Sequence, residues 1–237
     1  MLLDTVSSIV DQSYQNWELL IVDDCSTDAI TKEVLQGLED ISDRVRVLST
    51  KSNSGAGLAR NVGLEYSQYD YIAFCDADDW WYPEKLEKQM NFMLENGDRF
   101  VCSYYEDCDS RLNVKSVVKQ KAKQSFRDLI SGCNIGSPGV IYCKEGVEDI
   151  RFPEARRGED WRMWLRLLRR IDYLYSYPEP LWKYRHIEGS TNSDKSKIVS
   201  AVIDLYKEEL HYSPLRSYLT FAFVFMPRYI WRKVIKK

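Results

Sequence analysis

The chain has 237 residues, of which 44% are hydrophobic and 29% charged, and its formal net charge at pH 7 is −3. This composition excludes a disordered chain, which has fewer apolar residues and a larger net charge, and the weak negative charge argues against nucleic-acid binding. With only two histidines a multi-histidine metal site is excluded, and no apolar run reaches the roughly 18 residues of a membrane-spanning helix.

Strands and helices alternate through the first hundred residues. Continuous apolar runs that end on acids are typical of buried parallel strands, and apolar residues at helical spacing predict the helices between them. We expect strands at 17–22, 44–48 and 71–75, and helices at 4–10, 29–38, 59–66 and 83–94, the last of which is ended by Asn96 and Gly97. The second half is less regular, with strands expected at 100–104 and 139–142, a helix at 160–170 and a helical tail from residue 197.

This alternation predicts an α/β fold with a mixed, mainly parallel central sheet flanked by helices. In such sheets, ligands bind beyond the carboxyl ends of the strands. Two clusters of acidic residues, at 23–28 and 76–79, fall at that edge. We therefore expect the functional site there.

The strand expected at 71–75 runs directly into Asp76, Asp78 and Asp79. Carboxylates this close repel one another, and a divalent cation, which prefers oxygen ligands, removes that cost. Mg²⁺ takes only one or two protein carboxylates and shares its other positions with phosphates and water. The cluster favours a metal–phosphate site, although Asp78 or Asp79 as the N-cap of the following helix explains the same pattern.

The cluster at 23–28 has the same two interpretations. Thr27 or Asp28 is a suitable N-cap for the helix expected at 29–38. Asp23 and Asp24 lie at the strand tip, where a carboxylate accepts hydrogen bonds from a base N–H or a ribose hydroxyl.

The segment from Asn53 to Arg60 nearly spells the glycine fingerprint of dinucleotide-binding proteins, with Asp76 following at a suitable separation. The fingerprint requires a small residue at its third glycine position, which is Arg60 here, so this interpretation is disfavoured. A planar, permanently charged guanidinium suits a phosphate, with Asn61 beside it. The alternative is an ordinary surface arginine on a helix.

Gly158, Glu159 and Asp160 precede a strongly apolar helix. A carboxylate at this position can act as a general base on an acceptor hydroxyl, or it can simply cap the helix. Trp161 and Trp164 can form a wall on which a sugar stacks, but tryptophans at helical spacing more often belong to the core.

A polar loop is expected around Tyr184–His186 and residues 189–193. His186 can touch a metal or a diphosphate, although a lone histidine is more often structural. We regard His186 and Trp161 as candidates for contact with the diphosphate or the acceptor.

Together these motifs resemble the family 2 glycosyltransferases of the GT-A fold, from residue 1 to the polar loop. Each motif is weak alone, but five in this order at these separations are highly specific. The likeness is strongest to bacterial enzymes that build capsule, teichuronic acid or lipopolysaccharide chains. The segments that carry it are Gln12–Glu18, Val22–Asp28, Asn53–Gly55 with Ala59–Gly63, Asp76–Asp79 and Gly158–Asp160.

The resemblance implies an inverting glycosyltransferase that moves a sugar from a nucleotide-diphosphate donor, expected to be a UDP-sugar, to a hydroxyl of a glycan or lipid-linked acceptor in bacterial surface polysaccharide synthesis. Asp160 matches the catalytic base, and Glu159 orients the acceptor. Asp76 and Asp78 match the DXD motif, which binds Mg²⁺ or Mn²⁺ on the donor diphosphate, so that the metal neutralises the leaving group. The residues implied in nucleotide binding are Asp23, Asp24, Arg60, Asn61 and Asp76.

Family members open with an apolar strand that lies centrally in the sheet, followed by a turn that helps to hold the nucleotide base. Here the sequence begins at Met1–Asp4, where the following helix starts, so we expect the usual first strand to be missing and the edges of its neighbours to be open. The alternative function is then a catalytically impaired GT-A remnant that acts as a binding or scaffold subunit. We expect a GT-A catalytic domain at 1–195, with a nucleotide-binding half (1–100) and an acceptor half (101–195), and a helical tail at 196–237.

The segment 210–237 contains no acid and alternates basic with aromatic residues. A basic, aromatic helix too short to span a membrane is typical of an interfacial anchor on anionic lipid. The alternative is a helix that packs its aromatic side chains onto the catalytic domain. The six cysteines form no CxxC pair and no secretory signal opens the chain, so we expect reduced thiols in a cytoplasmic protein, peripheral on the inner face of the cell membrane.

Overall fold

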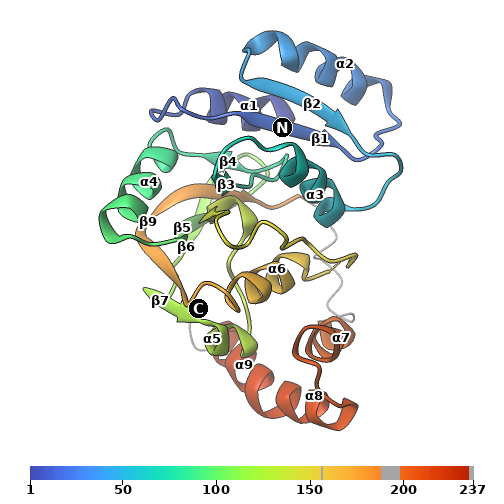
Figure 1. Cartoon of the computed structure of the whole chain (residues 1–237), viewed down its shortest axis with the longest axis vertical. Coiled ribbons are helices and arrows are strands. Elements are labelled where there is room, and N and C mark those ends of the chain that lie inside the picture. Colours follow the sequence, from blue (N-terminus) through green and yellow to red (C-terminus); the bar gives the residue numbers. More distant parts are fainter. Residues whose placement is uncertain (156, 188–197, 235–237) are drawn as a thin grey trace.

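A computed structural model of the chain describes residues 1–155, 157–187 and 198–234 (Figure 1). The strands are β1 (Leu19–Asp23), β2 (Val45–Ser49), β3 (Tyr71–Ala73), β4 (Trp80–Trp81), β5 (Phe100–Cys108), β6 (Val114–Val118), β7 (Lys123–Ser125), β8 (Ile141–Cys143) and β9 (Tyr173–Arg185). The α-helices are α1 (Leu2–Val10), α2 (Ala29–Leu38), α3 (Ala56–Tyr66), α4 (Lys85–Asn96), α5 (Phe126–Ile130), α6 (Glu159–Leu167), α7 (Ile198–Leu210), α8 (Pro214–Thr220) and α9 (Met226–Val234). Short 3₁₀ turns lie at Glu39–Ile41 and Ser137–Gly139, and a π-helical turn lies at Phe221–Phe225.

The strands form two sheets in the described part of the chain. β1 and β2 pair in parallel, with Leu19 opposite Val45. The larger sheet has the order β3–β8–β5–β9–β4, with β6 beside β5 and β7 beside β9. β5 and β9 pair in parallel there, and the other pairs of this sheet are antiparallel. The fold is α/β with a mixed sheet, as predicted, but parallel pairing is less dominant than we expected.

The β1–β2 sheet is joined to the larger sheet by side chains of the first helix. Within the described residues, β1 pairs with β2 alone and β3 pairs with β8 alone. The hydroxyl of Thr5 donates to the backbone oxygen of Asp79 at 2.6 Å, and Nε2 of Gln12 donates to the backbone oxygen of Tyr82 at 2.7 Å. The buried amide of Gln12 also accepts from the N–H of Leu86 at 2.9 Å. These hydrogen bonds fix α1 to the acidic turn without a shared strand ladder.

α6 contributes Met163, Trp164, Leu165 and Leu167 to the main hydrophobic core. Figure 1 shows this helix in the middle of the molecule. Trp164 is fully buried and packs against Phe74, Phe100 and Phe152, with ring centroids 5.6–6.1 Å apart. The interpretation of Trp164 as a core residue is therefore confirmed. This packing of Trp164 fixes the position of α6, whose first two residues are Glu159 and Asp160.

The longest strand, β9, is not predicted by the sequence analysis, which placed Tyr184 and Arg185 in a loop. That placement is wrong, because both residues end a 13-residue strand that pairs with β4, β5 and β7. Pro178 and Pro180 interrupt the strand pattern in the sequence. Proline is tolerated at bulges, and the β5–β9 register shifts where Tyr104 faces Pro180.

The ends of α2 and α4 agree with the capping signals in the sequence. The N–H of Thr31 donates to Oδ1 of Asp28 at 2.8 Å, which confirms Asp28 as the N-cap of α2. Gly97 is the left-handed C-cap of α4, with φ 67°.

The predicted starts of α3 and α4 need correction. α3 begins at Ala56, three residues before the predicted start, because Gly55 adopts φ 90° at the N-cap, a conformation that glycine reaches without strain. α4 begins at Lys85 after Glu84, and no side chain caps it. The interpretation of Asp78 or Asp79 as its cap is therefore wrong.

The C-terminal helices pack onto the domain. α7 contributes Val202, Leu205 and Tyr206 to the main core, and Phe225 is buried against it. None of the helices in the described ranges is both long and apolar enough to cross a bilayer. The six cysteines all lie in described segments, and no disulfide joins any two of them.

The 3₁₀ turn at Ser137–Gly139 packs closely on a buried indole, and this generates a stability prediction. A Cβ added at Gly136 would lie 2.6 Å from Cη2 of Trp182. We expect Gly136→Ala to lower the free energy of unfolding by about 1–3 kcal/mol through overpacking, measured by thermal or denaturant unfolding.

Gly37→Ala is the matched control, because a Cβ at this exposed position of α2 meets nothing within 4 Å. Alanine favours a helix over glycine, so this variant should be slightly more stable than the wild type. A melting temperature of Gly136→Ala at or above that of the wild type would contradict the close contact.

Candidate active site

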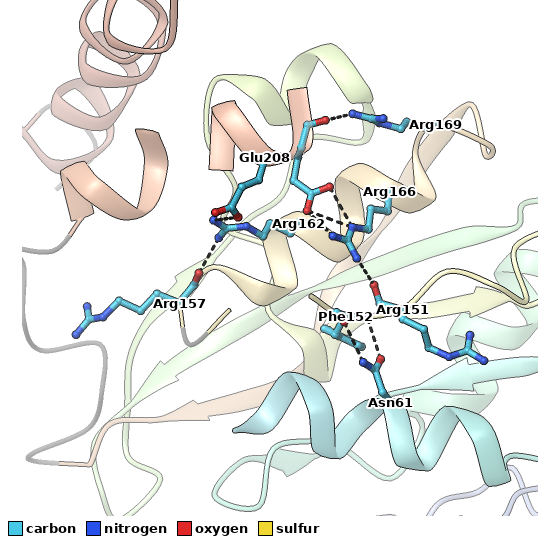
Figure 2. Close-up of polar contacts among 9 residues, drawn as sticks. Asn61, Arg151, Phe152, Arg157, Arg162, Arg166, Arg169 and Glu208 are labelled. Carbon is cyan, nitrogen blue, oxygen red and sulfur yellow. Dashed lines mark hydrogen bonds and ion pairs between the residues drawn. The ribbon is translucent and has the colours of Figure 1, made fainter. Parts of the chain in front are cut away.

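The candidate site lies where the N-terminal part of α3 meets the segment that leads into α6. The side chain of Asn61 pairs with the backbone of Phe152, donating to its oxygen at 2.9 Å and accepting from its N–H at 2.8 Å (Figure 2). A Cβ at Gly57 would lie 3.3 Å from Cβ of Phe152 and 3.4 Å from Cβ of Glu159. Glycine at this position permits α3 to approach the start of α6 closely.

Arg60, on α3, joins three carboxylates from two other segments. Its Nη2 lies 2.5 Å from Oδ1 of Asp76, which follows β3 closely. Its Nη1 lies 3.0 Å from Oδ1 of Asp160 and 3.8 Å from Oε1 of Glu159, both in the first turn of α6. The guanidinium is also 5.3 Å from the ring centroid of Phe152. Residues that are far apart in the sequence thus form one cluster, which we call the Arg60 cluster (Arg60, Asp76, Glu159 and Asp160).

Burial and mutual repulsion control protonation in the Arg60 cluster. The pKa of Asp160 is raised to about 6, mainly by burial; Arg60 opposes this rise, and Asp76 and Glu159 add to it. Burial opposes the charge of Arg60, but the carboxylates around it raise its pKa above the ordinary value, so the guanidinium stays charged. One guanidinium faces three carboxylates, so the cluster retains excess negative charge when these are ionised.

The acidic turn after β3 holds two further carboxylates in different surroundings. Asp79 is fully buried; its Oδ1 accepts from the N–H of Arg185 at 3.0 Å, and its Oδ2 is left without a hydrogen-bond partner. Burial, with Asp76 nearby, raises the pKa of Asp79 well above its usual range and so favours its protonated form. The hydrogen bond from the N–H of Arg185 ties the turn to β9. Asp78 is only half-buried, and burial and then Asp76 raise its pKa.

The acidic turn after β3 is better suited to a metal ion that a bound ligand also coordinates than to an ion held by protein side chains alone. Among the residues that the structure describes, no three His, Cys, Asp or Glu side chains are grouped closely enough to hold an ion. Asp76 and Asp78 are close enough for Asp76 to raise the pKa of Asp78, and a cation bound there would remove this repulsion. Because Mg²⁺ commonly takes one or two carboxylates and completes its shell with phosphate oxygens and water, these two residues match its requirements.

Asp24, at the carboxyl end of β1, fixes the loop that precedes α3. Its carboxylate accepts from the hydroxyl of Thr50 at 2.8 Å, from the N–H of Ser54 at 3.0 Å and from the N–H of Gly55 at 2.6 Å. Asp24 therefore helps to set the start of the helix that carries Arg60. Asp23 accepts from the N–H of Ser26 at 3.1 Å and stabilises the turn after β1. The contacts of these residues and of Asn61 with a nucleotide stay predictions.

His186 and Trp161 contact other parts of the domain. Nε2 of His186 pairs with Oδ1 of Asp107. Nε1 of Trp161 donates to the backbone oxygen of Leu129 at 2.8 Å, and its indole stacks on Phe225 with ring centroids 5.9 Å apart. Their contact with a diphosphate or an acceptor stays a prediction. Residues 189–193 of the expected polar loop lie outside the described residues.

The arginines of α6 attach this helix to α7, a role that the sequence analysis did not assign (Figure 2). Arg166 forms a two-pronged pair with Glu209, with Nη2 2.7 Å from Oε1. The side chain of Arg162 is 3% exposed, lies 3.1 Å from Glu208 and donates to the backbone oxygen of Arg157 at 2.9 Å. The sequence did contain a signal for this attachment. Arg162 and Arg166 are four positions apart on one helix, and a later helix carries the adjacent pair Glu208 and Glu209.

Solved structures with the same arrangement of helices and strands are glycosyltransferases of the GT-A fold. Residues 1–349 of Staphylococcus aureus TarS, in complex with UDP-GlcNAc, superpose with a TM-score of 0.72 and 19% identity, covering 98% of this chain and 72% of that chain. The mannosyltransferase PcManGT of Pyrobaculum calidifontis, in complex with GDP-Man and Mn²⁺, has a TM-score of 0.66 and 15% identity, covering 90% of this chain and 61% of that chain. At these identities the likeness shows the fold alone.

Sequence comparison shows the family. The family model described as Glycosyl transferase family 2 matches residues 1–144. The chain is 36% identical over 212 residues to TuaG of Bacillus subtilis (strain 168), named provisionally as a teichuronic acid biosynthesis glycosyltransferase, with 88% of this chain and 84% of TuaG covered. It is 33% identical over 201 residues to WfgD of Escherichia coli, a UDP-Glc:alpha-D-GlcNAc-diphosphoundecaprenol beta-1,3-glucosyltransferase, with 81% and 75% covered. The chain belongs to glycosyl transferase family 2.

Proposed function

We propose that this glycosyltransferase moves a sugar from a UDP-sugar to a hydroxyl of a glycan or lipid-linked acceptor in bacterial surface polysaccharide synthesis, with inversion at the anomeric carbon. The observation that carries the proposal is the attachment of Asp76 and Asp160 to the same guanidinium. It brings a candidate base on α6 next to the acidic turn expected to face the donor. The names of WfgD and of the related WfaP specify a UDP-Glc donor and a diphosphoundecaprenol-linked acceptor, which supports this choice of substrates.

Asp160 is proposed as the general base. With a pKa of about 6 it is mainly deprotonated at neutral pH and still a strong enough base to accept a proton from a hydroxyl in the transition state. Its side chain keeps 28% of its surface exposed, so an acceptor can reach it. As the acceptor oxygen attacks the anomeric carbon, its proton passes to Asp160, and the bond to the diphosphate oxygen breaks on the opposite face of the sugar.

Arg60 and Glu159 are proposed to position this base. The positive charge of Arg60 holds the pKa of Asp160 below the value that burial alone would give. Glu159 shares the same guanidinium and is placed to orient the acceptor. Asp24 is proposed to act on the nucleotide through the loop that it fixes. Asp23 and Asn61 are proposed as further nucleotide contacts.

Asp78 and Asp76 are proposed to hold Mg²⁺ or Mn²⁺ together with the donor diphosphate. A bound metal would supply positive charge that neutralises the leaving nucleoside diphosphate. The charge balance of the site supports this, because a diphosphate adds negative charge beside a cluster that already has an excess of it. One structural neighbour, PcManGT, is a complex with GDP-Man and Mn²⁺.

A lipid-linked acceptor places the reaction at a membrane surface. We propose that the chain works as a peripheral protein on the cytoplasmic face, in contact with anionic lipid. The basic, acid-free segment 210–237 supports this contact.

Asp160→Asn tests the proposed base. The amide cannot accept the proton, so we expect the transfer rate to fall by about 10²–10⁴-fold, while donor binding measured by calorimetry stays within about twofold of the wild type. Glu159→Gln is the matched control, since it changes the neighbouring carboxylate in the same cluster and should reduce transfer less. Wild-type turnover in Asp160→Asn would remove the base assignment.

Asp78→Ala tests the metal proposal. We expect Mn²⁺ to strengthen the binding of UDP to the wild type and to have little effect on the variant, because the main protein ligand is lost. Titration calorimetry with and without EDTA measures both. Asp40→Ala, at an exposed aspartate of the 3₁₀ turn after α2, should bind as the wild type does. An equal effect of Mn²⁺ on Asp78→Ala and the wild type would contradict the assignment.

A further inference from the structure

The C-terminal helices carry one aromatic row that faces the domain. Phe221, Phe225 and Tyr229 stack in succession, with ring centroids 5.4 Å and 5.6 Å apart. Phe225 is buried and stacks on Trp161 of α6. Arg228 donates to the backbone oxygen of Asp128 and so fastens α9 to α5. This inner row accounts for the packing alternative raised by the sequence.

A second row on the same helices is left exposed. We call it the outer face, and its side chains are large and apolar. Their exposed fractions are 72% for Leu215, 56% for Tyr218, 48% for Leu219, 75% for Phe223 and 50% for Ile230. Single exposed apolar residues are ordinary on protein surfaces, but five within sixteen positions of one helical segment form a patch that needs a partner.

The π-helical turn keeps the outer face continuous. Leu215, Leu219 and Phe223 recur every four residues, and a four-residue step exceeds one α-helical turn, so such a row drifts around a plain helix. The π-helical turn at Phe221–Phe225 contains more residues than an α-helical turn, so it cancels part of this drift around the helix axis. Ile230 therefore lies on the same side of the helix as Leu215, Leu219 and Phe223. The inner row, which also has four-residue steps, is kept in register in the same way.

The positive charge of the C-terminal segment indicates what kind of surface the outer face binds. From His211 to Lys237 the sequence has no Asp or Glu, although the chain as a whole has a net charge of −3. The basic residues of this segment are Arg216, Arg228, Arg232, Lys233, Lys236 and Lys237. An exposed apolar helical row, in a segment whose sequence contains basic residues and no acids, matches the boundary between the headgroups and acyl chains of an anionic bilayer.

We propose that the outer face of α8 and α9 is a docking surface for an anionic lipid bilayer, on which these helices lie in the plane of the membrane. This proposal specifies which residues make the membrane contact of the proposed function, and it rests on the lipid-linked acceptor proposed there. In Figure 1 the two helices occupy the end of the molecule opposite to β1, β2 and α2, with α6 between them. Docking therefore turns the acceptor half towards the lipid and the nucleotide-binding half away from it.

The docking surface is connected directly to the proposed base. Trp161 follows Asp160 in the sequence, and its indole stacks on Phe225, which belongs to the same helical turn as the exposed Phe223. The inner and outer rows are opposite sides of one short helical segment. Membrane docking thereby sets the height of Asp160 above the bilayer as well as holding the protein there.

Vesicle flotation of the full chain tests the proposal. The probes are vesicles of phosphatidylcholine alone and of phosphatidylcholine with phosphatidylglycerol in equal parts. We expect the wild type to float with the anionic vesicles, less so at high salt, and not with the neutral ones. The variant Leu219→Ser with Phe223→Ser should lose about tenfold or more in partitioning, because two apolar side chains no longer enter the bilayer.

Ile30→Ser is the matched control, because it removes a side chain that is 76% exposed at the opposite end of the molecule, and it should float as the wild type does. Equal flotation of the double variant and the wild type would overturn the proposal. So would a concentration-dependent dimer in sedimentation that the double variant abolishes, since the outer face would then bind a second copy. Unchanged melting temperatures show that the variants are folded.

Flotation needs neither donor nor acceptor, so the two proposals fail in different ways. Flotation without any transfer activity would contradict the proposed function and leave the docking surface intact. Transfer to a soluble acceptor analogue without flotation would contradict the docking surface and the proposed lipid contact, and would leave the proposed transfer reaction intact.

Discussion

The site depends on one interaction, the placement of the Arg60 guanidinium between Asp76 and Asp160. Carboxylates brought together at this depth would otherwise repel one another and take up protons. The three side chains come from α3, from the turn after β3 and from α6, so none of them is correctly placed until all three segments have folded. One positive charge cannot balance three carboxylates, and this excess of negative charge is the basis for the cation proposed at the site.

The position of α6 has support from both sides of the molecule. Gly57 lets α3 approach its first turn, and Arg166 ties its far end to Glu209 on α7. The tail adds a third support through the stack of Trp161 on Phe225. The C-terminal helices are therefore part of the framework that places the proposed base, and their exposed side is available to fix that framework to a surface.

Local signals in the sequence were sufficient for much of the nucleotide-binding half and insufficient for the sheet beyond it. Asp28 and Gly97 act within one turn of their own helices, so the start of α2 and the end of α4 could be predicted. β9 could not, because its stabilising pairs are with distant strands and prolines mask its pattern. In the same way the carboxylates of the site were identified from their places at strand and helix ends, whereas the partners of Arg60 depend on tertiary packing that no local pattern contains.

The most direct test is an NMR titration of the Asp160 carboxyl carbon in the wild type, in Arg60→Gln and in the control Arg46→Gln. A carboxylic acid loses its proton more readily beside a positive charge, so removing the guanidinium should raise the pKa. The account predicts a midpoint of about 6 in the wild type and in Arg46→Gln, and a higher midpoint in Arg60→Gln. An unchanged midpoint in Arg60→Gln would show that Arg60 and Asp160 do not interact, and would contradict the account.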